Sequence, residues 1–213
     1  MESSTRTNTR TPFGVALAAA IWLIAVGTAI LLITRYSSFP GNPGHPPSRW
    51  PGGSLARSRD LPTLLLFLHP HCPCSRATLS ELEVLLVQGN GLLKTLILFT
   101  RPPGTPDEWS ATDLWRTAHR IPGATTVEDK AATEARRFNV ETSGTALLYS
   151  PSGELLFHGG LTRARGHSGD NAGRDALLAL ARGTLRKSAH NPVFGCPLFN
   201  ETCGTNAQEV SNE

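Results

Sequence analysis

The sequence predicts an α/β fold, a mixed sheet flanked by helices and preceded by one N-terminal transmembrane helix. Three observations support this. An uncharged apolar run covers residues 13–34, apolar runs of strand length alternate with helical patterns from residue 61 onward, and two of the later runs flank a turn. Alternating strands and helices favour parallel pairing, whereas a hairpin adds antiparallel strands. With 213 residues, of which 39% are hydrophobic, the chain is long enough for one domain with a single core.

The apolar run from Phe13 to Thr34 contains no charge and no proline. As a helix it would span about 33 Å, which is enough to cross a bilayer. Because the run is longer than the apolar region of a cleaved signal peptide, we expect an uncleaved signal anchor. Arg6 and Arg10 precede it and only Arg35 follows closely, so the positive-inside rule favours a cytoplasmic amino terminus. The sequence therefore predicts a single-pass protein of the inner (cytoplasmic) membrane whose C-terminal domain is periplasmic.

Residues 37–60 hold five prolines and four glycines and almost nothing apolar, which is typical of a semi-rigid extended spacer. The composition changes at Leu61, where the folded part is expected to begin. The expected organisation is a cytoplasmic tail (1–12), a transmembrane anchor (13–34), a linker (35–60), a folded domain (61–190) and a Cys-containing C-terminal tail (191–213).

The net charge of +3 comes from 20 Lys and Arg against 17 Asp and Glu. Three of those cations, Arg6, Arg10 and Arg35, lie in or next to the expected anchor, so the outer portion is close to neutral. This balance gives no basic face, and a nucleic-acid partner is not implied.

Each element of the folded domain has its own signal. A continuous apolar run bounded by turn residues predicts a buried strand over 62–69, and apolar residues at helical spacing predict a helix over 75–87. The later elements follow from the same patterns: a strand over 92–100, a helix over 107–120, a strand near 125–127, a helix over 130–138, an antiparallel hairpin of 145–149 with 154–158 around the turn 150–153, and a helix that Asp170 caps and that runs to about Leu185.

The stretch HPHCPCSR, residues 69–76, carries the chemistry that the sequence suggests. Cys72 follows a strand and precedes a helix, so its sulfur would lie near the positive end of that helix. This setting lowers the pKa of a thiol and populates the nucleophilic thiolate. Pro73 lacks an N–H that a first helical turn does not use. The pattern therefore predicts a redox-active Cys72.

The same atoms also suit a metal. Cys72 and Cys74 together with His71 or His69 offer thiolate and imidazole ligands, which favour Cu(I) and, less specifically, Zn²⁺. Two further histidines are candidates for a distant ligand: His158 and His167.

The order of elements and the string around the cysteines resemble the thioredoxin-like superfamily, whose signature is Cys-x-x-Cys at the start of the first long helix after a strand. In this alignment Cys72 takes the attacking position, Ser75 stands where the resolving cysteine belongs, and Cys74 is an additional thiol one residue early. The segment FNVETSGT, residues 138–145, is similar to the one where that superfamily places a cis-proline, and Gly144 takes the place of the proline.

This resemblance implies a substrate-binding loop formed by Ser143, Gly144 and Thr145, with an ordinary trans peptide and a free N–H at residue 144. More narrowly, the strings HPHCPCSRAT, TSGTALLYSPSG with GGLTRARGHSGDNAGRDA, and NPVFGCPL look like the bacterial membrane-anchored RedB-like group. That likeness runs from about Pro62 to Leu198.

Two cysteines could resolve an oxidised Cys72. Cys74 is nearest, but a Cys-x-Cys bridge closes a small and strained ring. Cys196 could fold back from the tail onto the site. Alternatively, Cys196 and Cys203 form a structural disulfide with each other.

The leading hypothesis is thiol–disulfide exchange with protein thiols or disulfides as substrates and no cofactor, Cys72 attacking and Cys74 or Cys196 resolving. The alternative is a Sco-like copper-binding or chaperone module in which Cys72, Cys74 and His71 hold the ion. A third hypothesis is a redox-inactive interaction domain.

Overall fold

The computed structural model of the protein describes residues 11–199. The chain forms two compact units that divide between Ser37 and Ser38. The expected N-terminal tail, apart from its last two residues, and Cys203 lie outside the described residues.

The first unit is a single apolar helix, α1, over Thr11–Ser38. From Phe13 to Ser38 it is long and apolar enough to cross a membrane by length and composition, with a mean hydropathy of 2.6. Its large apolar side chains are exposed, as Trp22 is at 64%. A helix that is apolar on every face is typical of a membrane span. The expected apolar helix is therefore confirmed, and its extent is slightly longer than the predicted run.

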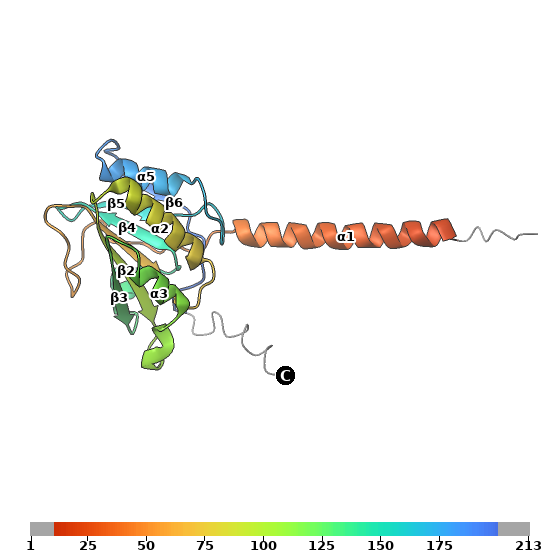
Figure 1. Ribbon diagram of the computed structural model, residues 1–213, viewed down its shortest axis with the longest axis horizontal. Coiled ribbons are helices and arrows are strands. Elements are labelled where there is room, and N and C mark those ends of the chain that lie inside the picture. Colours follow the sequence, from red (N-terminus) through yellow and green to blue (C-terminus); the bar gives the residue numbers. More distant parts are fainter. Residues whose placement is uncertain (1–10, 200–213) are drawn as a thin grey trace, which may run out of the picture. The chain divides into compact units, whose positions relative to one another are not determined.

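The second unit is built on a six-stranded sheet in the order β3-β2-β1-β4-β5-β6 (Figure 1). Strand β1 pairs in parallel with β2 and antiparallel with β4, so the sheet is mixed as expected. The predicted hairpin is present as the antiparallel pair β4 and β5, whereas β6, which pairs in parallel with β5, has no counterpart among the predicted elements. The strands are β1 (Thr63–Leu68), β2 (Lys94–Arg101), β3 (Ala124–Lys130), β4 (Thr145–Tyr149), β5 (Leu155–Gly159) and β6 (Ala189–Asn191).

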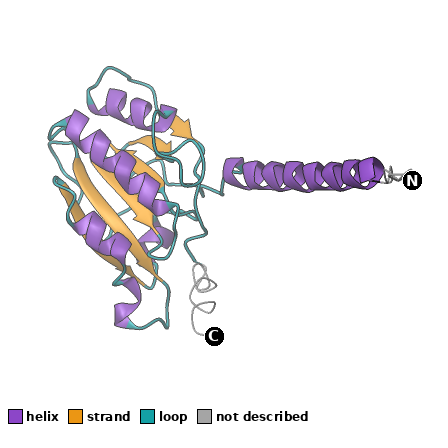
Figure 2. Ribbon diagram, turned by 45° about the vertical axis from the view of Figure 1, so that its right-hand side comes forward, coloured by secondary structure: helices purple, strands orange, loops and turns teal. Residues whose placement is uncertain are grey.

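Both faces of the sheet are covered, which explains why the central strand is apolar without alternation. On β1, Leu64 and Leu66 pack in the core beneath α2, α3 and α5, and Leu65 and Phe67 pack in a second core with α4. Helices α2 and α5 lie side by side over one face of the sheet (Figures 1 and 2). The helices of this unit are α2 (Ser75–Gly89), the 3-10 helix η1 (Asp107–Ser110), α3 (Asp113–His119), α4 (Thr133–Arg137) and α5 (Ala172–Ala181).

Two predicted helices differ from the observed ones for local reasons. The expected helix over 107–120 is divided into η1 and α3, because the Thr112 hydroxyl accepts a hydrogen bond from the Trp115 N–H and begins a new helix there. The expected helix over 130–138 begins only at Thr133. Strand β3 continues to Lys130, and the Asp129 carboxylate caps the start of α4 through two backbone N–H groups.

The last helix begins at Ala172 and ends at Ala181, short of the predicted Leu185. Its cap is Asn171, whose side-chain oxygen accepts from the Arg174 N–H at 2.7 Å, and not Asp170 as the sequence suggested. Asn and Asp cap helices equally well, so the sequence alone did not separate these neighbours.

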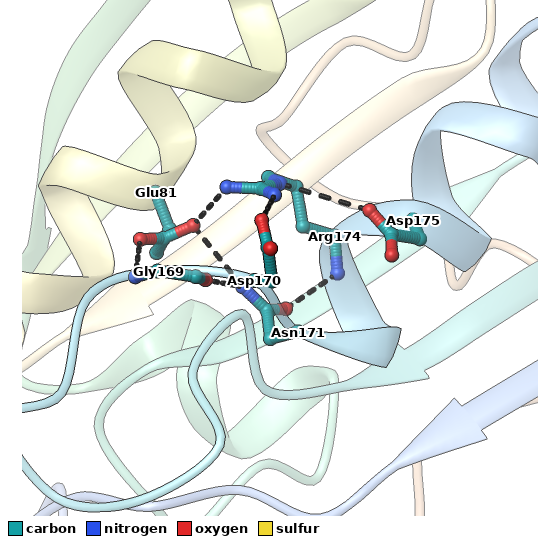
Figure 3. A network of polar contacts seen from close by, with 6 residues as sticks. All are labelled: Glu81, Gly169, Asp170, Asn171, Arg174 and Asp175. Atoms are coloured by element: carbon teal, nitrogen blue, oxygen red, sulfur yellow. Dashed lines mark hydrogen bonds and ion pairs between the residues drawn. The ribbon is translucent and has the colours of Figure 1, made fainter.

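A buried polar network joins α5 to α2 (Figure 3). Glu81 on α2 is 2% exposed, and its carboxylate pairs with the Arg174 guanidinium on α5 at 2.6 Å. The same carboxylate accepts from the Gly169 N–H and from the Asn171 side-chain amide. Arg174 also reaches the exposed Asp170 at 3.2 Å. The network therefore ties the helix that begins at the cysteines to the loop and helix that follow β5.

The segment expected to be a spacer is instead packed on the domain. We call residues 41–57 the strap. The Gly41 N–H donates to the Val193 carbonyl at 2.8 Å, and the Trp50 N–H donates to the Gly153 carbonyl at 2.8 Å. The folded unit therefore begins near Gly41, about 20 residues before the boundary that composition indicated.

Aromatic packing explains why the strap is held. The Trp50 ring lies edge-on to Phe138 and to Tyr149, with centroids 5.1 and 5.2 Å away. The Tyr149 hydroxyl donates to the Pro47 carbonyl at 2.9 Å. A proline-rich backbone leaves its carbonyls without internal partners, and here one of them accepts from a core side chain.

The expected C-terminal tail is also part of the fold. We call residues 193–198 the C-terminal segment. Its first and last residues, Val193 and Leu198, are 0% exposed. Antiparallel bridges join Val193 to Gly41 and Pro197 to Thr142. These contacts place Cys196 within the domain.

Candidate functional site

Cys72 lies in the loop that connects β1 to α2, three residues before the helix begins. Its N–H donates to the His69 carbonyl at 3.1 Å, and its carbonyl accepts from the Ser75 N–H at 3.1 Å. These two hydrogen bonds each close a turn just after the end of β1, and they fix the backbone on both sides of Cys72. Cys72 is only 2% exposed, so neighbouring groups cover nearly all of it.

Three cysteines meet at this point, two from the loop and one from the C-terminal segment. The pKa of the Cys72 thiol is lowered well below its ordinary value. The largest cause is a hydrogen bond from the Cys196 thiol, followed by one from the Cys74 thiol. Burial acts in the opposite direction, and the Cys196 N–H and the Ser75 side chain add smaller stabilising contacts. The surrounding donors therefore favour the thiolate form of Cys72.

Cys74 occupies the N-cap position of α2 and is half-buried. Its side chain makes no capping hydrogen bond to the helix. The pKa of its thiol is raised, first because it donates a hydrogen bond to Cys72, then because of burial and the negative charge of Cys72. Arg165 opposes this shift through its charge and a hydrogen bond. Cys74 is therefore the protonated partner of the Cys72 thiolate.

Cys196 is also half-buried, and its backbone is paired with the loop before β4. The Ser143 N–H donates to the Cys196 carbonyl at 2.8 Å, and the Leu198 N–H donates to the Glu141 carbonyl at 2.8 Å. Cys196 therefore lies beside Cys72, as one of the alternatives from the sequence expected, although the two residues are 124 positions apart.

The loop expected to bind substrate is not open. Ser143, Gly144 and Thr145 are all buried. The Gly144 N–H, expected to be free, donates to the Phe67 carbonyl at 2.8 Å. Gly144 has φ +92°, a backbone conformation that favours glycine. The C-terminal segment pairs with the backbone of this loop, since the Cys196 carbonyl accepts from the Ser143 N–H.

The histidines beside the cysteines pack against an aromatic ring. The His71 ring lies 4.6 Å from the Trp109 ring, and its Nε2 is 2.9 Å from the Trp109 carbonyl. His69 is fully buried, and its Nδ1 accepts from the His71 N–H. Among residues 11–199 there is no group of three His, Cys, Asp or Glu side chains placed to hold a metal ion.

The two more distant histidines do not join the cysteines. His158 lies on β5 beside His190 and lines a separate cavity of about 390 Å³. His167 hydrogen-bonds through Nδ1 to the Arg165 carbonyl at 3.2 Å.

Two residues at the site were not predicted to act there. The Ser75 hydroxyl is hydrogen-bonded to the Ser143 hydroxyl at 2.9 Å and so joins α2 to the covered loop. Arg165, in a polar glycine-containing loop, donates through Nη1 to the Gly195 carbonyl. The position of Ser75 in the motif could have indicated its role, but no local pattern separates Arg165 from a solvated arginine.

A pocket of about 330 Å³ lies beside Cys72. Its wall includes His71, Arg76, Thr112 and Asp113, and Arg76 and Asp113 form an exposed ion pair at 3.6 Å.

The lowered pKa of Cys72 predicts reactivity at mildly acidic pH. A depressed pKa keeps the thiolate populated until the pH falls to that pKa, so alkylation of Cys72 by iodoacetamide should change little between pH 8 and pH 6. An ordinary thiol loses on the order of 100-fold in rate over that interval. Tandem mass spectrometry of the peptide that contains both Cys72 and Cys74 measures each rate. The same peptide in the denatured protein is the control, and a fall for Cys72 that parallels this control would contradict the prediction.

No family model matches the chain, and no curated protein matches it. Solved structures do match. A hypothetical protein from Sinorhizobium meliloti is 17% identical with a TM-score of 0.57, covering 78% of this chain and 99% of that one. An uncharacterized conserved protein from Geobacillus kaustophilus is 16% identical with a TM-score of 0.55, covering 78% and 94%. A secreted disulfide oxidoreductase from Mycobacterium tuberculosis is 17% identical over 58% of this chain and 81% of its own, with a TM-score of 0.41.

At such low identities structural similarity speaks for the fold alone. The order of the strands, with β1 between a parallel and an antiparallel neighbour and helices on both faces, is that of a thioredoxin-like mixed sheet. The second unit of this chain therefore has a thioredoxin-like α/β fold.

Proposed function

We propose that this protein carries out thiol–disulfide exchange through Cys72. The observation that carries the proposal is the convergence of three thiols, Cys72, Cys74 and Cys196, at the start of α2, with the central one stabilised as a thiolate. A thiolate is the species that attacks a disulfide, and a second thiol within reach is what releases the mixed disulfide that results.

The proposed substrates are protein thiols or disulfides outside the cytoplasm. The apolar helix α1 supports anchoring in the inner membrane, and Arg6 and Arg10 before it support a cytoplasmic amino terminus. Disulfides persist in such a compartment, which gives an exchange protein its substrates. The narrower likeness of HPHCPCSRAT and NPVFGCPL supports membership of the RedB-like group.

The test is the Cys72→Ser variant of the full-length protein in detergent, assayed for reduction of a disulfide-bonded peptide with dithiothreitol as reductant. We expect the variant to lose at least about 100-fold in rate, because its hydroxyl does not ionise in this range. The matched control is Ser80→Ala, an exposed position on the same helix. If Cys72→Ser retains the wild-type rate, or if purified protein carries one copper per chain that Cys72→Ser and Cys74→Ser both remove, the proposal is wrong.

A further inference from the structure

The C-terminal segment runs beside the loop before β4 and is joined to it by an isolated bridge between Pro197 and Thr142. Its backbone is held on both sides of Cys196, by the Ser143 N–H at the Cys196 carbonyl and by the Glu141 carbonyl at the Leu198 N–H, each at 2.8 Å. Leu198 is 0% exposed and belongs to the second core. Cys196 is therefore fixed in place and is not carried by a loose tail.

Gly195 allows this close approach. A Cβ atom built on Gly195 would lie 1.9 Å from the Ser143 carbonyl oxygen, a contact that no side chain can make. The neighbouring atom is backbone and cannot move aside cheaply. Any residue larger than glycine would push the segment, and Cys196 with it, away from the loop before β4.

Arg165 also holds the C-terminal segment in place. Its Nη1 donates to the Gly195 carbonyl, and its guanidinium also interacts with the Cys74 side chain. Arg165 therefore contacts Gly195, the residue before Cys196, and also contacts Cys74, the other candidate resolving cysteine.

Cys74 is poorly placed to resolve. It lies in helical conformation at the N-cap of α2, with φ −65° and ψ −24°, and only Pro73 separates it from Cys72. A Cys-x-Cys disulfide would have to close a ring of three residues while the helix start is held, which strains the S–S geometry. Cys196 comes from the C-terminal segment, and its thiol and its backbone N–H both donate hydrogen bonds to the Cys72 sulfur.

We propose that Gly195 and Arg165 are positioning residues that make Cys196, and not Cys74, the resolving thiol of Cys72. This inference rests on the proposed function.

In the first step the Cys72 thiolate attacks one sulfur of a partner disulfide. The partner S–S bond breaks, the Cys72–partner bond forms, and the other partner sulfur leaves as a thiolate. In the second step Cys196, having given its proton to solvent, attacks the Cys72 sulfur. The Cys72–partner bond breaks, the Cys72–Cys196 disulfide forms, and the second partner thiolate leaves. The partner disulfide has then gained the two electrons that the two cysteines have lost.

The experiment uses full-length protein in detergent and a limiting amount of the chromogenic disulfide dithiobis-nitrobenzoate. Each reagent molecule releases one coloured thiolate when the mixed disulfide forms and a second when it is resolved. A pH of about 9 is used, where an ordinary thiol is largely ionised, so that loss of the Cys196 contacts to Cys72 does not by itself slow the first step.

Wild type and Cys74→Ser are expected to release two thiolates per reagent molecule. Cys196→Ser is expected to release one and to retain an adduct that mass spectrometry locates on Cys72. Gly195→Ala should release the first thiolate within about twofold of the wild-type rate and the second about 10- to 100-fold more slowly, because a misplaced reacting group loses most of its effective concentration.

Arg165→Met is the second variant, in case Gly195→Ala fails to fold, and should show the same split between the two steps. Arg165→Lys, which keeps a donor on a long side chain, should recover part of the second rate. Gly52→Ala is the matched control, since nothing lies within 4 Å of a Cβ at Gly52, and it should behave as wild type. A purely structural role for Gly195 or Arg165 would slow both steps together.

The inference is overturned if Cys74→Ser stalls after the first thiolate and Cys196→Ser does not, or if Gly195→Ala resolves at the wild-type rate. It is also overturned if peptide mapping of the oxidised protein finds a Cys196–Cys203 bond. Failure of the proposed function itself looks different: Cys72→Ser would then release both thiolates as fast as wild type.

Discussion

Replacing Glu81 with Ala is expected to lower the free energy of unfolding by about 3–5 kcal/mol, the cost of leaving a buried charge without its partner. Glu81 is 2% exposed and Arg174 8% exposed, so water cannot solvate the guanidinium once the carboxylate is gone. The substitution also removes the acceptor for the Gly169 N–H and for the Asn171 side chain (Figure 3). Because domains of this kind are stable by only about 5–15 kcal/mol, the loss is large. Urea unfolding of the full-length protein, followed by circular dichroism, measures it.

The matched control is Asp170→Ala, which removes an exposed partner of the same arginine and should leave the urea midpoint close to that of wild type. The double variant Glu81→Met with Arg174→Met should recover much of the loss, because an apolar pair of similar volume needs no counter-charge. A Glu81→Ala midpoint equal to that of Asp170→Ala would contradict the role given to this pair.

Phe138→Ala is expected to cost about 3–5 kcal/mol of unfolding free energy, as large-to-small changes at buried aromatic positions do. Phe138 is 1% exposed and touches three aromatic rings, those of Trp50, Phe67 and Tyr149. Two measurements follow from this position. Urea unfolding reports the loss of core packing, and limited trypsin digestion at Arg49 and Arg57 reports release of the strap, which we expect to be cleaved at least about 10-fold faster.

Phe138→Leu is the control, since it keeps most of the apolar volume and should cost less than about 1.5 kcal/mol. The strap should remain protected in this variant. Rapid cleavage of the strap in wild type and both variants alike would show that the Trp50 contacts do not hold it.

The sequence was informative where one short segment specifies its own structure. The apolar runs at 62–69 and 92–100 predicted β1 and β2, and the turn at 150–153 predicted the hairpin, because periodicity and turn residues act over a few positions. The strand–Cys–helix order placed Cys72 correctly for the same reason.

The errors arose where distant segments meet. The strap has the composition of a free linker, and only the rings of Phe138 and Tyr149, about 90 residues away, give Trp50 a place to pack. Cys196 was one of the two cysteines that the sequence offered as partners of Cys72, but no pattern near Cys72 separates it from Cys74 as the larger cause of the lowered pKa. The free N–H expected at residue 144 is instead bonded to the carbonyl of Phe67, 77 residues earlier in the chain.

The pairing of Gly41 with Val193 has a practical consequence for anyone who expresses this domain alone. A fragment limited to residues 61–190, the boundaries that composition suggests, would lack the strap with Trp50 and the C-terminal segment with Cys196 and Leu198. Such a fragment should express poorly and should lack the Cys196 thiol in any redox assay. A fragment that begins before Gly41 and ends beyond Phe199 should retain both the packed segments and that thiol.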